Sequence, residues 1–239
     1  MQQIMSALRP IYFDTFAHSS GGPALAPVPF RHPIGTTGPC DGVLKRMMDL
    51  FLALTILIVF GIPLLLVAAA IRLTSKGPAL FRQQRIGLNG EWFTMLKFRT
   101  MRHSIELPGH CRQATRHDGR VTTIGAWLRR TSVDELPQLL NVLHGSMSLV
   151  GPRPHAPGTC AAGRPFEAIT HSYAARHCVK PGMTGLAQVR GWRGETDTEE
   201  KLLRRIDSDL EYIATRSLGG DLLIICRTVD TVTRMLNAY

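Results

Sequence analysis

The sequence has no cysteine arrangement that supports a disulfide framework or a structural zinc site. Its five cysteines, an odd number, are widely spaced, without a C-x-x-C pair or a Cys/His cluster at zinc-ligand spacing. We also find no secretory signal peptide at the N-terminus. These absences predict a reducing, cytoplasmic setting for the soluble part of the chain.

Acidic residues are scarce: 18 Asp and Glu stand against 28 Lys and Arg, a net charge of +10. A chain with this balance prefers anionic partners, such as nucleic acid, anionic lipid or phosphorylated metabolites. The excess is concentrated between Arg82 and Arg130, where ten basic residues meet only three acids. This concentration indicates a phosphate-facing surface, although a solvated basic face gives the same pattern.

Charge is absent from the 22 residues between Leu50 and Ile71, which is long enough to cross a bilayer as one helix. Pro63 lies in the middle and predicts a sharp bend near Ile62, because proline removes a backbone donor. Basic residues flank both ends, and the positive-inside tendency places both ends on the cytoplasmic face. We therefore favour a re-entrant helical hairpin over a single span or a buried core helix.

The composition divides the chain into three parts. Residues 1–40 are rich in proline and glycine and are predicted to form a flexible tail. Residues 41–76 would form the re-entrant membrane hairpin, and residues 77–239 a catalytic domain that faces the cytoplasm. The fold class we expect is α+β, mainly helical with a small β-hairpin, with a membrane helix broken at Pro63 and with interfacial amphipathic helices.

Local patterns predict several elements of the third part. Two strand-like runs, 79–85 and 92–99, flank the turn dipeptide Asn89-Gly90 and indicate a hairpin. Residues 196–200 contain a capping-box pattern before apolar residues at helical spacing. The stretch 222–236 is apolar with interspersed arginines, which suits a helix in the membrane interface or one packed on the core.

The adjacent acids Asp134 and Glu135 are the strongest candidates for chemistry. Pro137 is tolerated within a first helical turn, so the helix should begin near Asp134, with both acids at its positive end. Ordinary capping by Ser132 and Glu135, or by Asp134 itself, explains the same residues. The surrounding cations favour phosphoryl transfer instead: two arginines immediately upstream, K-F-R at 97–99 and G-P-R-P at 151–154.

In such a site one carboxylate attacks phosphorus while the other holds a divalent metal on the diphosphate. A carboxylate is ionised at pH 7 and needs no separate base. Magnesium is the metal expected, since it prefers oxygen ligands and is commonly held by one or two carboxylates plus substrate phosphates. Lysine and arginine would stabilise the charge on the transferring oxygens.

The chain resembles the bacterial sugar transferase family, the monotopic polyprenyl-phosphate phosphoglycosyl transferases, from about Lys45 to its C-terminus. Six motifs carry the resemblance in order: KRMMDL, TSKGPALFRQQRIGLNG, LKFRTM, LRRTSVDELPQLLNVLHGSMSLVGPRP, VKPGMTGLAQVRG, and the D-x-x-Y of Asp209 and Tyr212. Several long motifs in register are far more specific than one short pattern.

The resemblance implies that Asp134 attacks the sugar-proximal phosphate of a UDP-sugar, releases UMP and passes the phosphosugar to undecaprenyl phosphate. Glu135 would be the metal-binding acid, with Mg²⁺ as cofactor. The residues that would contact substrate phosphates are Lys97, Arg99, Arg129 and Arg153, with Arg193, Asp209 and Asp221 as weaker assignments.

Family members break the membrane helix at Ser-Pro, whereas this chain has Ile62-Pro63, so the serine's contribution to the bend is missing. The string G-W-R-G-E-T at 191–196 resembles members that transfer glucose 1-phosphate at the start of exopolysaccharide synthesis, although galactose or an N-acetylated sugar stays open. The expected location is the bacterial inner membrane, with membrane lipid as a partner and no nucleic acid. A homo-oligomer stays open, as does the alternative of a non-catalytic basic module that binds anionic lipid or nucleic acid.

Overall fold

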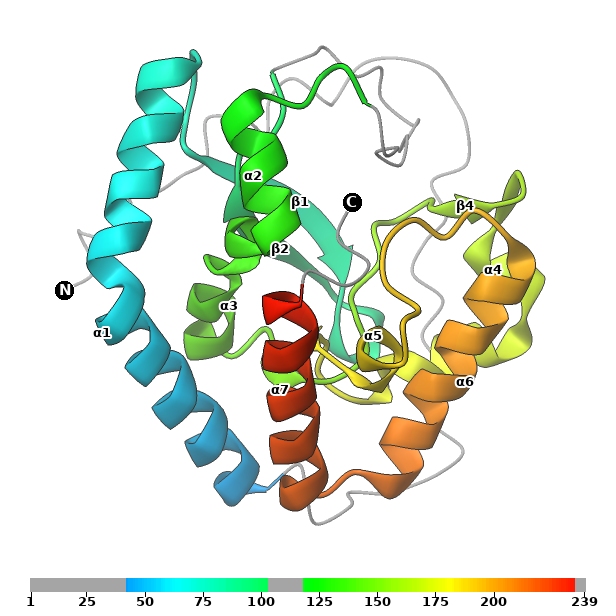
Figure 1. The fold of residues 1–239 in the computed structure, drawn as a ribbon. Coiled ribbons are helices and arrows are strands. Elements are labelled where there is room, and N and C mark those ends of the chain that lie inside the picture. Colours follow the sequence, from blue (N-terminus) through cyan, green and yellow to red (C-terminus); the bar gives the residue numbers. More distant parts are fainter. Residues whose placement is uncertain (1–41, 103–117, 235–239) are drawn as a thin grey trace, which may run out of the picture.

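The computed structural model describes residues 42–102 and 118–234, so the predicted tail and part of the basic stretch lie outside the described residues. Three sets of buried hydrophobic residues hold the molecule together, centred on Leu139 and Val150, on Phe166 and Leu202, and on Phe98 and Leu128. Helices surround a few short strands (Figure 1). The predicted α+β class is confirmed.

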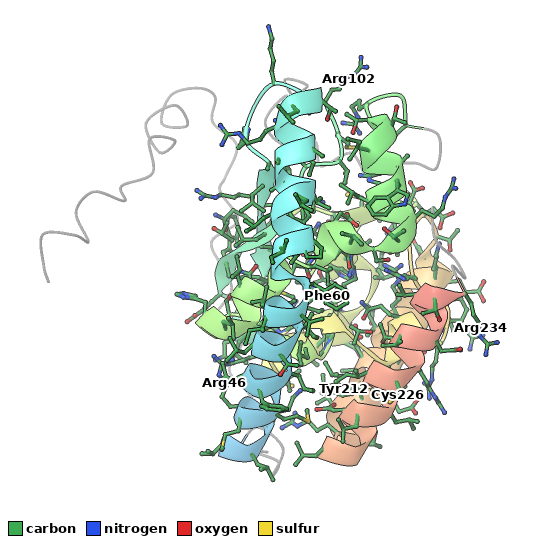
Figure 2. All side chains as sticks on the ribbon, turned by 60° about the vertical axis from the view of Figure 1, so that its left-hand side comes forward. Arg46, Phe60, Arg102, Tyr212, Cys226 and Arg234 are labelled. Carbon is green, nitrogen blue, oxygen red and sulfur yellow. The ribbon has the colours of Figure 1, made fainter. Side chains whose placement is uncertain are left out.

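The first helix, α1 (Val43–Thr74), is long and apolar enough to cross a membrane. Most of it is exposed: Phe51, Ile58 and Ile62 each expose 70% or more of their surface. The buried core helix is therefore excluded. In Figure 2 α1 lies at the front of the molecule, with Phe60 about half-way along.

The helix is continuous through Pro63, although it changes direction in its middle part (Figure 1). The proline accounts for a bend there, because it cannot donate the backbone hydrogen bond of its turn. The re-entrant topology stays a prediction.

The predicted hairpin is confirmed as β1 (Leu80–Ile86) paired antiparallel with β2 (Trp92–Phe98). A single 3₁₀ turn, η3 (Leu88–Gly90), joins them, and Asn89 and Gly90 both adopt positive φ there. Asparagine and glycine tolerate that conformation better than other residues, which explains why this dipeptide stands in the turn between the two strands.

The middle of the chain supplies α2 (Thr123–Thr131), the 3₁₀ turn η4 (Val133–Glu135) and α3 (Gln138–His144). β3 (Ser148–Val150) then pairs in parallel with β6 (Gly182–Thr184). Between these strands lie four short elements: β4 (Cys160–Ala161), β5 (Arg164–Pro165), α4 (Phe166–Ile169) and η5 (His171–Cys178).

After α5 (Leu186–Val189), the chain forms α6 (Glu199–Thr215) and α7 (Leu218–Thr233). The predicted capping box is wrong in register: Thr198 caps α6, and its hydroxyl accepts from the Lys201 amide at 3.3 Å. The Thr196 hydroxyl instead accepts from Arg205. Ile224 of α7 packs into the core, which confirms one of the two predicted roles, while Leu222, Leu223 and Val229 are exposed. A place for α7 in the membrane interface stays a prediction.

Candidate active site

Asp134 and Glu135 lie in η4, one turn before α3 begins at Gln138. The sequence predicted a helix from Asp134, but the chain first makes a 3₁₀ turn and then passes through Pro137. Ordinary capping is not what these acids do. The Ser132 side chain caps neither helix, and its hydroxyl accepts from Arg193 Nη2 at 2.7 Å. Both acids are therefore available for another role.

Glu135 is held by Arg153, which follows β3. The guanidinium binds both carboxylate oxygens, Nη1 to Oε2 at 3.0 Å and Nη2 to Oε1. Burial opposes ionisation of Glu135, but the charge and hydrogen bonds of Arg153, with the charge of Arg193, lower its pKa to about 2. Glu135 is thus a fixed negative charge at every physiological pH.

Asp134 is only 8% exposed. Burial and the neighbouring charge of Glu135 raise its pKa to about 7, although Lys97, Arg129 and Arg153 act in the opposite direction. An acid and a set of cations thus surround one buried carboxyl group. Such perturbed groups cluster at functional sites.

Lys97 reaches the site from β2 because α3 holds that strand. Asn141 donates from Nδ2 to the Thr94 carbonyl at 2.8 Å and accepts from the Leu96 amide at 2.9 Å. The Lys97 ammonium lies 5.2 Å from the centre of the Phe81 ring. Burial and the charge of Arg85 lower the pKa of Lys97 to about 8, which the two acids partly offset.

Arg129 comes from the last turn of α2, where its Nε donates to Thr100 Oγ1 at 3.0 Å. Its charge lowers the pKa of Asp134. Gly125 allows this helix to approach, because a Cβ there would lie 2.0 Å from the Thr100 carbonyl oxygen. The structure therefore brings together Asp134, Glu135, Lys97, Arg129, Arg153 and Arg193.

Three predicted residues are engaged elsewhere. Arg99 donates to the carbonyls of Lys76 and Ser75, at 2.7 and 2.8 Å, and so caps the end of α1. Asp209 is buried in an ion pair with Arg176 at 2.6 Å. Asp221 is buried between Lys45, at 2.9 Å, and the Tyr212 hydroxyl. Their contact with substrate phosphates stays a prediction, and these bonds give each a structural role.

Sequence reasoning missed Arg176, Gln138 and Asn141. Arg176 is fully buried, and its Nη2 donates to the carbonyl of Arg153 at 2.7 Å. Gln138 is 1% exposed, and within the described residues its Nε2 has no hydrogen-bond partner. Both glutamine and asparagine stand in the quoted D-E-L-P-Q-L-L-N string, so their spacing after Asp134 was an available signal; Arg176 had none.

In residues 42–102 and 118–234, no three His, Cys, Asp or Glu side chains are grouped to hold a metal ion. The adjacent carboxylates of Asp134 and Glu135 nevertheless fit Mg²⁺ in ligand type, because this ion takes one or two carboxylates together with substrate phosphates. Each oxygen of Glu135 that accepts from Arg153 retains a further lone pair.

The profile of the family described as "Bacterial sugar transferase" matches residues 40–235. The chain belongs to this family. A glucose-1-phosphate transferase of Caulobacter vibrioides, named as acting from UDP-glucose on undecaprenyl phosphate, is 52% identical over 195 residues, which cover 82% of this chain and 72% of that protein. This sugar transferase chain is also 50% identical over 189 residues to the exopolysaccharide production protein PSS of Rhizobium leguminosarum, covering 79% of this chain and 94% of that protein.

An undecaprenyl-phosphate glucose phosphotransferase of Komagataeibacter xylinus is 48% identical over 199 residues. These cover 83% of the sugar transferase chain but only 37% of that longer relative. The matched region includes η4 and every residue placed around it.

Proposed function

We propose that the chain transfers a sugar 1-phosphate, glucose 1-phosphate, from a UDP-sugar to undecaprenyl phosphate as the first step of exopolysaccharide synthesis. The observation that carries the proposal is a buried carboxyl group, Asp134, next to a permanently ionised one, Glu135, inside a ring of cations. The names of the Caulobacter and Komagataeibacter relatives support both substrates.

In the proposed reaction the Asp134 carboxylate attacks the sugar-proximal phosphorus, a P–O bond forms, and the bridging P–O bond of the diphosphate breaks. UMP leaves with that bridging oxygen. An oxygen of undecaprenyl phosphate then attacks the same phosphorus, forms the lipid diphosphate sugar and restores the Asp134 carboxylate. Lys97, Arg129, Arg153 and Arg193 neutralise charge on the transferring oxygens.

Glu135 would hold Mg²⁺, which supplies Lewis-acid polarisation of the diphosphate when bound. Arg153 fixes the Glu135 carboxylate, so that its orientation is set before substrate arrives. We further propose that the domain lies on the cytoplasmic face of the inner membrane, because basic residues flank the apolar part of α1 at both ends.

The decisive experiment is release of UMP by the purified protein with UDP-glucose, undecaprenyl phosphate and magnesium. Asp134→Asn should reduce the release to background, since an amide is no nucleophile for phosphorus here. The matched control is Asp207→Asn, an exposed acid on α6, which should keep wild-type turnover. A panel of UDP-sugars then identifies the sugar.

Trapping by mass spectrometry tests the intermediate directly. With UDP-glucose and magnesium but no undecaprenyl phosphate, a phosphosugar adduct should form on Asp134 in the wild type. Turnover of the Asp134→Asn variant at the wild-type rate, or an active preparation that never carries the adduct, would overturn the assignment. A protein that binds anionic lipid but releases no UMP would favour the non-catalytic basic module.

A further inference from the structure

A second charged site lies where the first turns of α1 and α7 meet, at the bottom of Figure 1. It is a cavity of about 240 Å³. The residues on its wall that carry charge are Lys45, Arg46, Lys180, Arg216, Asp49 and Asp221. The site is separate from η4, because none of the residues that line the cavity belongs to the set around Asp134 and Glu135.

The two acids of this cavity are already satisfied. Lys45 lies 3.0 Å from Asp49 Oδ1 and 2.9 Å from Asp221 Oδ2. The Ser148 hydroxyl donates to Asp49 at 2.8 Å and the Tyr212 hydroxyl to Asp221 at 2.9 Å. Lys45 balances one of the two negative charges of Asp49 and Asp221. The other three cations of the wall therefore outnumber the one negative charge that is left. The cavity wall is therefore net positive.

Two of those cations approach the same glycine, Gly145, which ends α3. A Cβ placed on Gly145 would lie 3.5 Å from Arg46 Nη2 and 3.9 Å from Lys180 Nζ. Arg46 donates to the carbonyls of Val142 and Leu143, which do not cancel its charge. Lys180 is half-buried, and in the described part of the chain its ammonium has no hydrogen bond or ion pair. Like charges held this close are stabilised by a shared anion.

The surroundings of the cavity select the kind of anion. Next to Lys45 and Arg46, α1 exposes Val43, Leu44 and Met47, and next to Asp221, α7 exposes Leu222 and Leu223. A soluble phosphate would leave these apolar side chains exposed to water, whereas the acyl chains of a lipid would cover them. The cavity is also smaller than the roughly 300–1,000 Å³ of pockets that enclose a whole small molecule. It suits a headgroup.

We infer that this cavity binds the phosphate headgroup of an anionic phospholipid, with the acyl chains along the exposed faces of α1 and α7. In this site Lys180 and Arg46 donate hydrogen bonds to the phosphate oxygens, and Arg216 adds positive charge. The lipid fixes the first turn of α1 against α7. This site does not depend on the proposed catalytic function.

The test is thermal unfolding in detergent micelles with added phosphatidylglycerol. Binding to the folded state should raise the Tm of the wild type by ~5 °C at lipid concentrations far above Kd. Lys180→Gln/Arg216→Gln should lose this rise. The charge-matched control Arg82→Gln/Arg204→Gln, which changes exposed arginines elsewhere, should keep it, as should the Asp134→Asn variant.

Further arms identify the source of the phosphate. An equal rise with glycerol 3-phosphate would assign the site to a soluble anion, and an equal rise with phosphatidylcholine would show that charge is irrelevant. Either result overturns the inference, as does a double variant that responds like wild type. Should the double variant not fold, Lys180→Gln alone must show a smaller rise; a full rise in that variant would reject the site.

Discussion

At the scale of single residues, Asp134 combines two conflicting demands. Burial and the Glu135 charge raise its pKa to about 7, so much of the carboxyl is protonated near neutral pH, whereas attack on phosphorus needs the ionised form. Lys97, whose pKa is lowered to about 8, is the cation that loses its proton next. Because Asp134 and Lys97 interact, the pKa values seen in a titration are properties of the pair rather than of either residue.

We therefore expect a bell-shaped dependence of UMP release on pH. The rate should rise with pH through about 7 as Asp134 ionises and fall above about 8 as Lys97 loses its charge. Values of kcat/KM between about pH 5.5 and 9.5 test this, because they report the pKa values of the free enzyme. In Lys97→Arg the guanidinium stays charged, so the alkaline fall should disappear. A rate that does not change with pH would contradict this view of the site.

The same pKa has a consequence for stability. The folded-state pKa of Asp134, about 7, exceeds the unfolded value of about 3.9. Its contribution is therefore fully present below the unfolded pKa and is lost as pH rises through about 7. Asp134→Asn stays neutral and should unfold several degrees higher than wild type at pH 8, at ~2–4 °C per kcal/mol.

That difference in Tm between variant and wild type should shrink toward pH 4. Glu135 acts with the opposite sign, since its lowered pKa gives stability that is lost as pH falls toward 2. Both proteins contain Glu135, so its effect is common to them. Thermal melts of the two proteins across this pH range provide the measurement, and a variant less stable at pH 8 would reject the assigned burial.

At the scale of elements, the site depends on how η4, β2 and the segment after β3 are held together. Gly151, Gly182 and Gly185 bring the end of β3 and the segment around β6 into close backbone contact: a Cβ on Gly182 would lie 2.1 Å from the Gly151 amide. From this junction the chain continues to Arg153. The Arg153 carbonyl accepts a hydrogen bond from Arg176, whose charge is balanced by Asp209.

Arg176 is therefore a positioning residue for Arg153 and, through it, for Glu135. Burial and the charge of Arg176 lower the pKa of His155 well below its usual value, so His155 Nδ1 accepts from Arg176 Nη1 at 3.0 Å. Arg176→Lys keeps the charge but cannot reproduce these planar contacts. We expect kcat to fall about tenfold or more, as for other small misplacements of catalytic groups, with KM little changed.

The pH profile separates positioning from general destabilisation. If Arg153 moves away, the pKa of Asp134 rises, and the acid limb of the profile shifts to higher pH in Arg176→Lys, as it should in Arg153→Lys. Arg190→Lys is the matched control, since Arg190 forms an exposed two-point pair with Glu211. A slower Arg176→Lys enzyme with an unmoved profile would indicate a structural role alone.

The elements also show what a sequence can and cannot predict. Asp134 and Glu135 were found because they are adjacent, and the hairpin because Asn89-Gly90 is a local signal. Arg176 and Asp209 are 33 residues apart and form one buried pair, which no local pattern reveals. Arg99 looked like a phosphate ligand because it lies two residues after Lys97, and such residues share one face of a strand. However, β2 ends at Phe98, and Arg99 donates instead to carbonyls at the end of α1.

At the scale of the whole molecule, both ends of α1 are attached to the same body of structure. Near its start, Asp49 accepts from the Leu149 amide and the Ser148 hydroxyl of β3. Near its end, Ile71 is buried with Phe98 and Leu128. A single span would place about 30 Å of hydrocarbon between these ends. One end of the helix would then lose its contacts with the rest of the protein.

We therefore expect both ends of α1 to lie on one side of the membrane. In a cysteine-free background, Gly42→Cys and Lys76→Cys, both at exposed positions just outside α1, should react with a membrane-impermeant maleimide from the same side of oriented vesicles. The middle of the helix supplies the control, because Ile62→Cys, within the lipid, should stay unlabelled from either side. Labelling of the two ends from opposite sides would mean a span, and the contacts of Asp49 or Ile71 would then have to be given up in the membrane.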